Sequence, residues 1–431
     1  MLVRQRILIN AAVIFLAIFW CFLHIWRKLF AYIEFMGIYI TEWILLLTLL
    51  LFFIYAFLRS RILNIFSYSD YFSSSMKLTL IFVIYGSLIA ILNININPIA
   101  FIPIAYLAYL PIFYIVFKES DKWVKEKFLR LTILFYILIP LLFHGVRGYL
   151  LYDFTSSLPG LDDAGWTFTY GVALTTSLVL ITNRFYRYIA FFVCLLGAIA
   201  LFQRGAIFCF IISYALVFMA DRSPRKYISL FVEIFILILT TILAVILVSN
   251  ILTTFSAIEL RFDLNPYSFG QFILSIFIND VDISGTGTGN SLSTRTHRIE
   301  MWLDIINYNF RSLGSFLFGN GFSGEVGDVL GISFRVPHNG FITVFYRTGI
   351  IGLIIFIALL ISLITKFFRY TPNDNFSNSA RIFGLTLIGS FLGDCFTGTI
   401  LDSPFTLFVF LCNLSLTMAF LNRRNLTERS N

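Results

Sequence analysis

The sequence predicts an all-α, polytopic membrane protein with about twelve transmembrane helices. Its 431 residues are 59% hydrophobic and only 13% charged, whereas soluble globular domains are about one quarter charged. Apolar runs of roughly 20 residues, the length that a helix needs to cross the hydrocarbon core, recur along the chain. The alternating ten-residue segments of a membrane β-barrel are absent. Helices are therefore the expected spanning elements, because only helices and closed barrels satisfy their backbone groups in lipid.

The predicted spans share long apolar stretches with few charges. They cover residues 6–25, 37–58, 77–95, 99–117, 127–144, 167–182, 187–203, 205–220, 227–250, 341–365, 382–397 and 403–421. No small-residue cleavage site follows the first of them, so we expect it to be a retained helix and not a removed signal peptide.

The net charge of +8 follows the predicted topology. If the N-terminus is cytoplasmic, most of the 31 lysines and arginines fall in cytoplasmic segments, as the positive-inside rule requires. Both termini are then cytoplasmic. The basic charge thus indicates a lipid bilayer as partner, and no nucleic acid.

The five cysteines all lie in or beside apolar runs: Cys21, Cys194, Cys209, Cys395 and Cys412. No CxxC pair or Cys/His ligand spacing is present in the sequence. We interpret them as small buried hydrophobic residues, and we expect neither a disulfide framework nor a metal site.

The chain divides by these patterns into three parts. Residues 1–250 hold the first nine spans, residues 251–340 form a large extracytoplasmic loop subdomain, and residues 341–431 hold the last three spans and a cytoplasmic tail. Within the loop, residues 285–293 are typical of a flexible linker, and Gly319–Gly321 predicts a turn. Apolar residues at helical spacing between them predict an amphipathic helix: Ile299, Trp302, Leu303, Ile306 and Phe310.

His338 and Arg298 are the first candidates for chemistry in this loop. His338 lies at the mouth of the tenth span, where an imidazole could take a proton from a sugar hydroxyl. The alternative is a helix-start residue that faces water. We expect Arg298 in the first turn of the loop helix, where a helix N-terminus and a guanidinium would both attract phosphate. The alternative is a solvated surface arginine.

Further arginines lie where the spans meet the extracytoplasmic side. Arg204 lies between two apolar runs, Arg147 follows the fifth span, and Arg347 is about seven residues into the tenth. Arginines inside or beside spans are costly and suggest function, although an interfacial position would also explain Arg347. Together they suit a lipid-linked diphosphate at the outer leaflet.

Acidic residues are weaker candidates. Asp394 and Asp402 flank the last short external loop, and Asp153, Asp162 and Asp163 lie in an earlier one. Each could orient His338 or bind sugar hydroxyls, but solvated loop charges are the simpler reading. No external group has metal-ligand spacing.

Several motifs taken together resemble the O-antigen ligase/polymerase superfamily. The resemblance rests on these segments: Gln203–Gly205, Arg298–Trp302, Leu317–Gly321, His338–Ile342 and Arg347–Gly352. The twelve-span layout with a large loop between spans nine and ten also resembles that superfamily.

The resemblance implies a membrane-embedded glycosyltransferase fold acting at the periplasmic face, without metal, nucleotide sugar or other cofactor. The implied substrate is an oligosaccharide on undecaprenyl pyrophosphate, and a chain-length regulator protein is a further candidate partner. The ligase branch implies Arg298 and His338 as the catalytic pair. Arg204, Arg147, Asn339, Arg347 and Asp402 are then the candidate substrate-binding residues.

Two enzyme activities fit this resemblance. An O-antigen polymerase joins lipid-linked repeat units, and the residues Tyr346–Gly349 and Leu401–Pro404 resemble polymerases more than ligases. An O-antigen ligase, which moves the finished chain to lipid A-core, is the alternative. A flippase or transporter of lipid-linked sugar is an alternative of another class, but it needs neither the large loop nor His338-Asn339.

Overall fold

The computed structural model describes most of the predicted spans and part of the loop. The residues described are 7–18, 34–35, 38–39, 43, 47, 50, 54, 70–92, 107–140, 164–200, 204–220, 231–233, 235, 239, 289–321, 339–398, 400–402 and 404–427.

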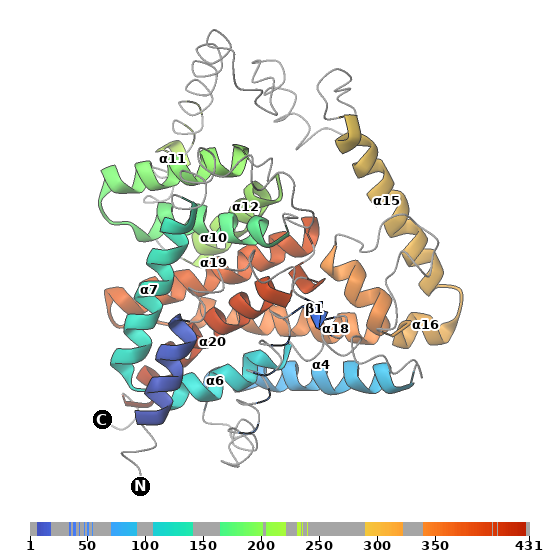
Figure 1. Ribbon diagram of the computed structural model, residues 1–431, viewed down its shortest axis with the longest axis horizontal. Coiled ribbons are helices and arrows are strands. Elements are labelled where there is room, and N and C mark those ends of the chain that lie inside the picture. Colours follow the sequence, from blue (N-terminus) through green and yellow to red (C-terminus); the bar gives the residue numbers. More distant parts are fainter. Residues whose placement is uncertain are drawn as a thin grey trace. The chain divides into compact units, whose positions relative to one another are not determined.

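The fold is all-α, as the sequence predicts (Figure 1). The α-helices are α4 (Ser73–Leu92), α6 (Tyr109–Glu119), α7 (Lys122–Pro140), α10 (Ala164–Leu180), α11 (Arg184–Ala200), α12 (Arg204–Ala220), α15 (Gly289–Asn309), α16 (Leu313–Phe318), α18 (Gly340–Arg369), α19 (Asn375–Thr397) and α20 (Pro404–Thr427). A short 3-10 helix, η2 (Ile400–Asp402), precedes α20. The strands in the described residues are β1 (Glu34–Phe35) and β2 (Ile38–Tyr39), which form one antiparallel pair.

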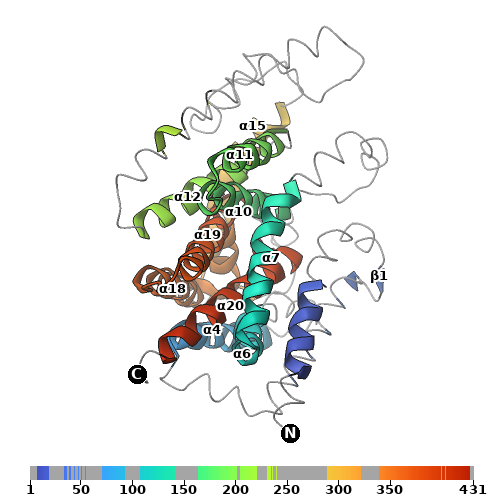
Figure 2. The same ribbon diagram turned by 90° about the vertical axis from the view of Figure 1, so that its left-hand side faces the viewer.

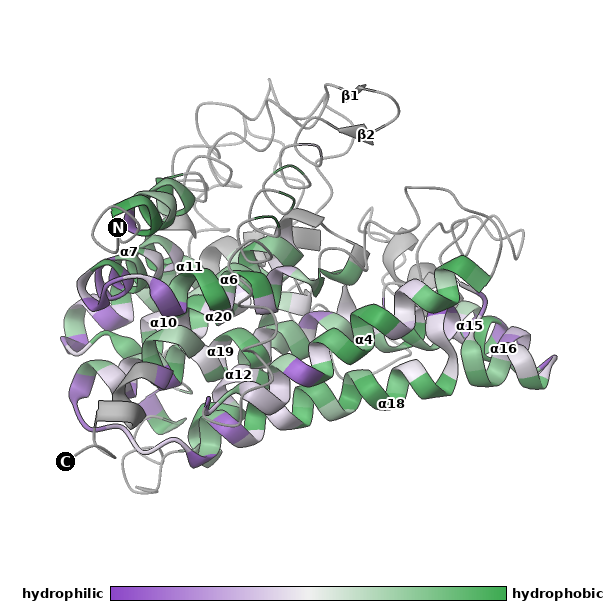
Figure 3. Cartoon of the chain, turned by 90° about the horizontal axis from the view of Figure 1, so that it is seen from below, coloured by the Kyte–Doolittle hydropathy of each residue, from purple (hydrophilic) through white to green (hydrophobic). Residues whose placement is uncertain are grey.

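The helix positions agree with the apolar pattern. Among the described residues, α4, α18 and α19 are long and apolar enough to cross a membrane. Figure 3 shows α4 and α18 side by side, with hydrophobic residues along most of their length. The apolar helices and their lengths make the chain a membrane protein. The last three predicted spans overlap α18, α19 and α20, although α19 begins earlier and α20 ends later than predicted.

The chain separates into two compact units. The first contains residues 1–220 and 308–431, and the second contains residues 221–307. Residues 308–321, which the sequence assigns to the loop subdomain, therefore group with the transmembrane helices. Most of α15 belongs to the second unit.

Small residues bring three helices of the first unit into close contact (Figures 1 and 2). A Cβ added to Gly393 of α19 would lie 2.5 Å from the Cα of Cys209 in α12. Gly171 of α10 also packs on Cys209, and the Ser213 hydroxyl of α12 is 2.9 Å from that of Ser390 in α19. Residues this small let helix backbones approach in a membrane, where packing and interhelical hydrogen bonds drive association.

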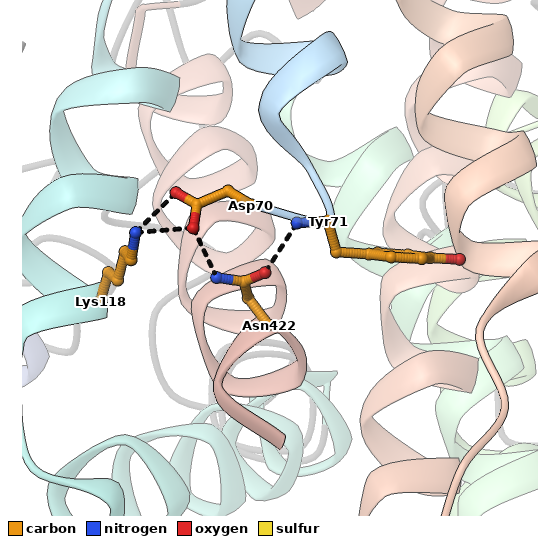
Figure 4. A network of polar contacts seen from close by, with 4 residues as sticks. All are labelled: Asp70, Tyr71, Lys118 and Asn422. Carbon is orange, nitrogen blue, oxygen red and sulfur yellow. Dashed lines mark hydrogen bonds and ion pairs between the residues drawn. The ribbon is translucent and has the colours of Figure 1, made fainter. Parts of the chain in front are cut away.

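Charged and polar side chains join α6, α20 and the residues directly before α4 (Figure 4). Lys118 Nζ donates to both carboxylate oxygens of Asp70, at 2.7 and 2.6 Å. Asn422 donates to Asp70 at 3.4 Å and accepts from the Tyr71 backbone N–H at 2.9 Å. The Arg381 guanidinium nearby donates to the carbonyls at the ends of two other helices. We call this the basic end.

The basic residues of the basic end are ones that the sequence places in the cytoplasm. They stand at the ends or starts of α6, α7, α11, α18 and α19, and include Lys118, Lys122, Lys127, Arg184, Arg187, Lys366, Arg369 and Arg381. Their grouping is the arrangement that the positive-inside rule predicts.

Candidate functional site

Four helices of the first unit begin at the end opposite the basic end. A Cβ added to Gly205, at the start of α12, would lie 2.6 Å from Thr167 of α10 and 2.8 Å from the Thr397 hydroxyl of α19. A Cβ added to Gly340, the first residue of α18, would lie 3.0 Å from Cys395 and 3.2 Å from Leu401. The starts of α10, α12 and α18, the last turn of α19 and η2 therefore meet, and α20 begins directly after η2. We call this the helix-start end.

The electrostatics of the helix-start end favour anions. The first N–H groups of a helix have no partner within the helix, and its N-terminus carries a partial positive charge. Four helix starts gathered in one place add these partial charges. Phosphate groups bind well to such positions.

Three of the residues predicted to bind substrate lie at this end. Arg204 is the first residue of α12, Asn339 caps α18, and Asp402 is the last residue of η2. The fold thus brings together, at the level of the backbone, residues that are almost 200 positions apart in the sequence. His338 and Arg147 lie outside the described residues, but His338 directly precedes Asn339.

Asn339 also has a structural role, in addition to its predicted role in substrate binding. Its side-chain oxygen accepts from the backbone N–H groups of Phe341 at 3.0 Å and Ile342 at 3.1 Å, and the residue is buried. It is the N-cap of α18, the position where asparagine is most favoured. The cap fixes where α18 begins and therefore where the chain carrying His338 joins it.

Arg347 lies beside a break in α18. Gly349 has a φ of 65° and a ψ of −169°, a conformation essentially restricted to glycine. It packs against the backbone of Leu317 and Gly319, and a Cβ on Gly319, whose φ is 78°, would lie 2.5 Å from the carbonyl of Arg347. The two glycines let α16 approach α18 backbone to backbone.

The carbonyl groups next to the break have partners from other elements. The Asn309 side chain donates to the Phe345 carbonyl at 2.8 Å. The backbone N–H groups of Asn320 and Gly321 donate to the carbonyls of residues 346 and 347, at 2.8 and 3.0 Å. Tyr85 of α4 donates to the carbonyl of residue 348 at 3.0 Å. Because membrane-embedded backbone must be satisfied internally, these contacts hold the backbone of Arg347 in a fixed place.

The structure corrects the local context of Arg298. The residue was expected in the first turn of its helix, but α15 begins at Gly289, so Arg298 is in the middle of the helix and has no helix N-terminus beside it. The expected linker 285–293 is wrong in its second half for the same reason. The buried face of α15 contains Met301, Ile305 and Asn309, one position away from the predicted apolar stripe. Arg298 belongs to the second unit, and its role remains a prediction.

Asp394 lies inside α19, one turn before the end of the helix, as the predicted span 382–397 implies. It is 0% exposed, so the simpler interpretation as a solvated loop charge is wrong. Neither carboxylate oxygen has a hydrogen-bond partner among the described residues. Its backbone carbonyl accepts from the Gly398 N–H at 2.6 Å, and a side chain on Gly398 would collide with its Oδ1 atom.

No cluster of three or more metal-ligating side chains occurs among the described residues. The expectation of a reaction without metal therefore stays a prediction from the family resemblance.

A family model connects the helix-start end with a known class of enzyme. Residues 189–357 match the family model described as O-antigen ligase. This match supports the O-antigen ligase/polymerase superfamily, and it covers less than half of the chain. The matched segment includes α12, α15, α16 and the part of α18 that holds Asn339 and Arg347. No curated protein matches the chain.

The match supports an activity in general terms only. It favours an O-antigen ligase or polymerase type of transferase in lipopolysaccharide synthesis, with a glycosyltransferase-like activity.

Proposed function

We propose that this protein is an O-antigen polymerase that joins oligosaccharide repeat units carried on undecaprenyl pyrophosphate. The observation that supports the proposal most is the convergence of four helix starts with Arg204, Asn339 and Asp402 at one end of the bundle. A diphosphate needs such an end, because backbone N–H groups and a guanidinium together stabilise a leaving anion.

The proposed reaction is a direct displacement. The acceptor sugar hydroxyl attacks the anomeric carbon of the donor, a new C–O bond forms, and the bond from that carbon to the diphosphate oxygen breaks. His338 takes the hydroxyl proton. Both electrons of the broken bond leave with undecaprenyl pyrophosphate, whose charge Arg204, Arg298 and Arg147 stabilise in this proposal. We assign Arg347, beside the break in α18, to the same anion.

This geometry predicts the stereochemistry. Attack from the face opposite the leaving diphosphate inverts the configuration at the anomeric carbon. A product that retains the donor's anomeric configuration, measured by NMR of the released polysaccharide, would exclude the single displacement.

The topology follows from the same proposal. The basic end lies in the cytoplasm with both termini, and the helix-start end opens to the periplasmic side of the inner membrane. A cysteine placed at Asp402 should then react with a membrane-impermeant thiol reagent added to intact spheroplasts, whereas one placed at Asp374, the N-cap of α19, should react only after lysis.

A gel of surface polysaccharide separates the candidate activities. Cells that lack the protein are complemented with the wild type or with His338→Ala. Lipid A-core bearing a single repeat unit in the deletion strain supports the polymerase, because ligation still operates. Bare lipid A-core with long chains retained on the carrier would establish the ligase instead, and repeat units trapped on the cytoplasmic side would establish a flippase. A normal ladder from His338→Ala would remove His338 from the reaction.

A further inference from the structure

The burial of Asp394, near the helix-start end, works against the stability of the fold. A buried carboxyl group without a hydrogen bond costs free energy, because it leaves water and gains nothing in exchange. Both oxygens of Asp394 are in this condition among the described residues. Nothing in the packing of α12 on α19 requires an acid at this position, since the neighbouring contacts of α19 are made by glycine and serine.

Asp70 is another buried acidic residue, and its contacts are those of a residue that stabilises the fold. Asp70, at the basic end, is 7% exposed and is bonded by Lys118 and Asn422 (Figure 4). The Asp394 carboxyl group has no such hydrogen bond or ion pair among the described residues. Because burial of this carboxyl group lowers the stability of the fold, we infer that a bound ligand supplies its hydrogen-bond donor.

The position of Asp394 restricts what that partner can be. It lies one turn below Thr397, which packs at the start of α12, and one residue before Cys395, which packs at the start of α18. An ionised diphosphate carries no N–H or O–H group to donate, so it cannot supply the hydrogen bonds that the Asp394 oxygens lack. A lipid-linked saccharide offers one other kind of group next to its diphosphate, namely sugar hydroxyls, which donate hydrogen bonds.

We propose that Asp394 is a substrate-binding residue that accepts hydrogen bonds from hydroxyl groups of the sugar attached to the lipid diphosphate. The assignment rests on the proposed function, because it takes the lipid-linked glycan as ligand. It adds the residue that recognises the sugar to the residues that hold the diphosphate.

Gly398 contacts the carboxyl group of Asp394. Its backbone lies directly over Oδ1 of Asp394, where a side chain on residue 398 would collide with the carboxylate. The Gly398 peptide is thus one of the groups that bury the acid. Binding of the sugar moves this peptide aside, and a methyl group at residue 398 would push the carboxylate out of place without changing its charge.

The test uses the full-length protein in nanodiscs and two ligands. One is the lipid fraction carrying repeat units, extracted from cells that lack the protein, and the other is undecaprenyl pyrophosphate without sugar. For Asp394→Asn we expect binding of the glycan-carrying lipid to weaken by about 10-fold to 100-fold, the usual effect of losing hydrogen bonds to a charged group. Binding of the sugar-free lipid should be unchanged, and the melting temperature should be equal to or above that of the wild type.

Two further variants make the result decisive. Gly398→Ala should reproduce the selective loss of glycan binding although the carboxyl group is retained. Asp70→Asn is the matched control for a structural acid: it should lower the melting temperature and leave both affinities of the folded protein unchanged.

Three outcomes would overturn the assignment. A lower melting temperature for Asp394→Asn with wild-type glycan binding would make the residue structural. If Asp394→Asn weakens the binding of both lipids equally, Asp394 either contacts the diphosphate or supports the folding of the whole site. If the wild type binds the sugar-free lipid but not the glycan-carrying one, the sugar assignment fails; if it binds neither, the proposed function fails with it.

Discussion

The two ends of the helix bundle are held together by different means. At the basic end, side chains join helices: Lys118 with Asp70, Asn422 with Tyr71, and Arg381 with two helix ends. At the helix-start end the helices approach through glycines, and the buried acid there, Asp394, has no partner among the described residues. The first end is stabilised by its polar groups, whereas the second contains a buried carboxyl group, that of Asp394, with no hydrogen bond among the described residues. This is the difference expected between an end that anchors a bundle and one that binds a ligand.

The largest effect should come from breaking the ion pair of the basic end. Lys118→Met leaves the Asp70 carboxylate, whose side chain is 4% exposed, with only the longer contact to Asn422. We expect a loss of about 3 kcal/mol in the free energy of unfolding, at the low end for a broken buried pair because Lys118 is partly exposed. Unfolding in mixed micelles with increasing SDS would measure it.

Substitution of the other partner of the ion pair gives a second test. Asp70→Asn keeps the shape of the side chain and leaves the ammonium group of Lys118, whose side chain is 36% exposed, able to reach water. Its loss should therefore be clearly smaller than that of Lys118→Met. Equal losses for the two variants would mean that burial of Asp70 does not govern the energetics of this end.

The glycine contact between α16 and α18 should give the next largest effect. Gly319→Ala and Gly349→Ala each place a Cβ against backbone of the other segment and force a residue other than glycine into a positive φ. We expect each to cost about 2 kcal/mol, in the range for such backbone strain. The double variant should cost less than the sum, because the first substitution already separates the segments.

Gly314 provides a control within the same structure. It lies in α16, and a Cβ there would make only an ordinary contact, 3.8 Å from the Ser312 hydroxyl. Gly314→Ala should therefore be neutral or stabilise the protein by up to about 1 kcal/mol through helix propensity. A loss as large as that of Gly319→Ala would show that the α16 region tolerates no added volume at all.

Periodicity and apolar length were sufficient to predict the helices. The spans that contain α4, α10, α12, α18 and α19 follow from runs of apolar residues, because a membrane imposes length and hydropathy on a helix directly. The start of α15 could not be predicted in this way. Its first residues, Gly289–Ser293, are typical of a linker, and propensity alone does not reveal a helix extended into such a segment.

The candidate site was predicted in part. Sequence position and family resemblance indicated Arg204, Asn339 and Asp402, which the fold brings to one end. The break at Gly349 was not predicted, because a single glycine inside an apolar run is compatible with an unbroken helix. Nor could the burial of Asp394 be foreseen, since it depends on Cys209 and Gly398, which only the fold brings close to it.

The hydrogen bonds that support the break predict a moderate effect. The Asn309 side chain is buried and donates to the Phe345 carbonyl, and its oxygen accepts from Asn320. Asn309→Ala removes both contacts and leaves a buried carbonyl without a donor, so we expect a loss of about 1.5 kcal/mol. Asn309→Ser, which can retain one bond, should lose less; an Asn309→Ala variant as stable as the wild type would show that water replaces the side chain.

Substitution of Tyr71 should change the stability least, and the pH dependence of this change tests the packing of the basic end. Its hydroxyl donates to the Lys366 carbonyl at 2.9 Å, so Tyr71→Phe should cost about 1 kcal/mol at neutral pH. Burial raises the pKa of Tyr71 above its ordinary value of 10.0, although Arg369 and Arg381 oppose the change. Below pH 10 the phenol is neutral in both the folded and unfolded states. Above it the unfolded state ionises first, so this part of the stability is lost as the pH rises toward the folded pKa. The difference in melting temperature between wild type and Tyr71→Phe should therefore shrink from pH 9 to pH 11. A difference that grows over this range would mean that the arginines outweigh burial, and that the positive charge of the basic end dominates its packing.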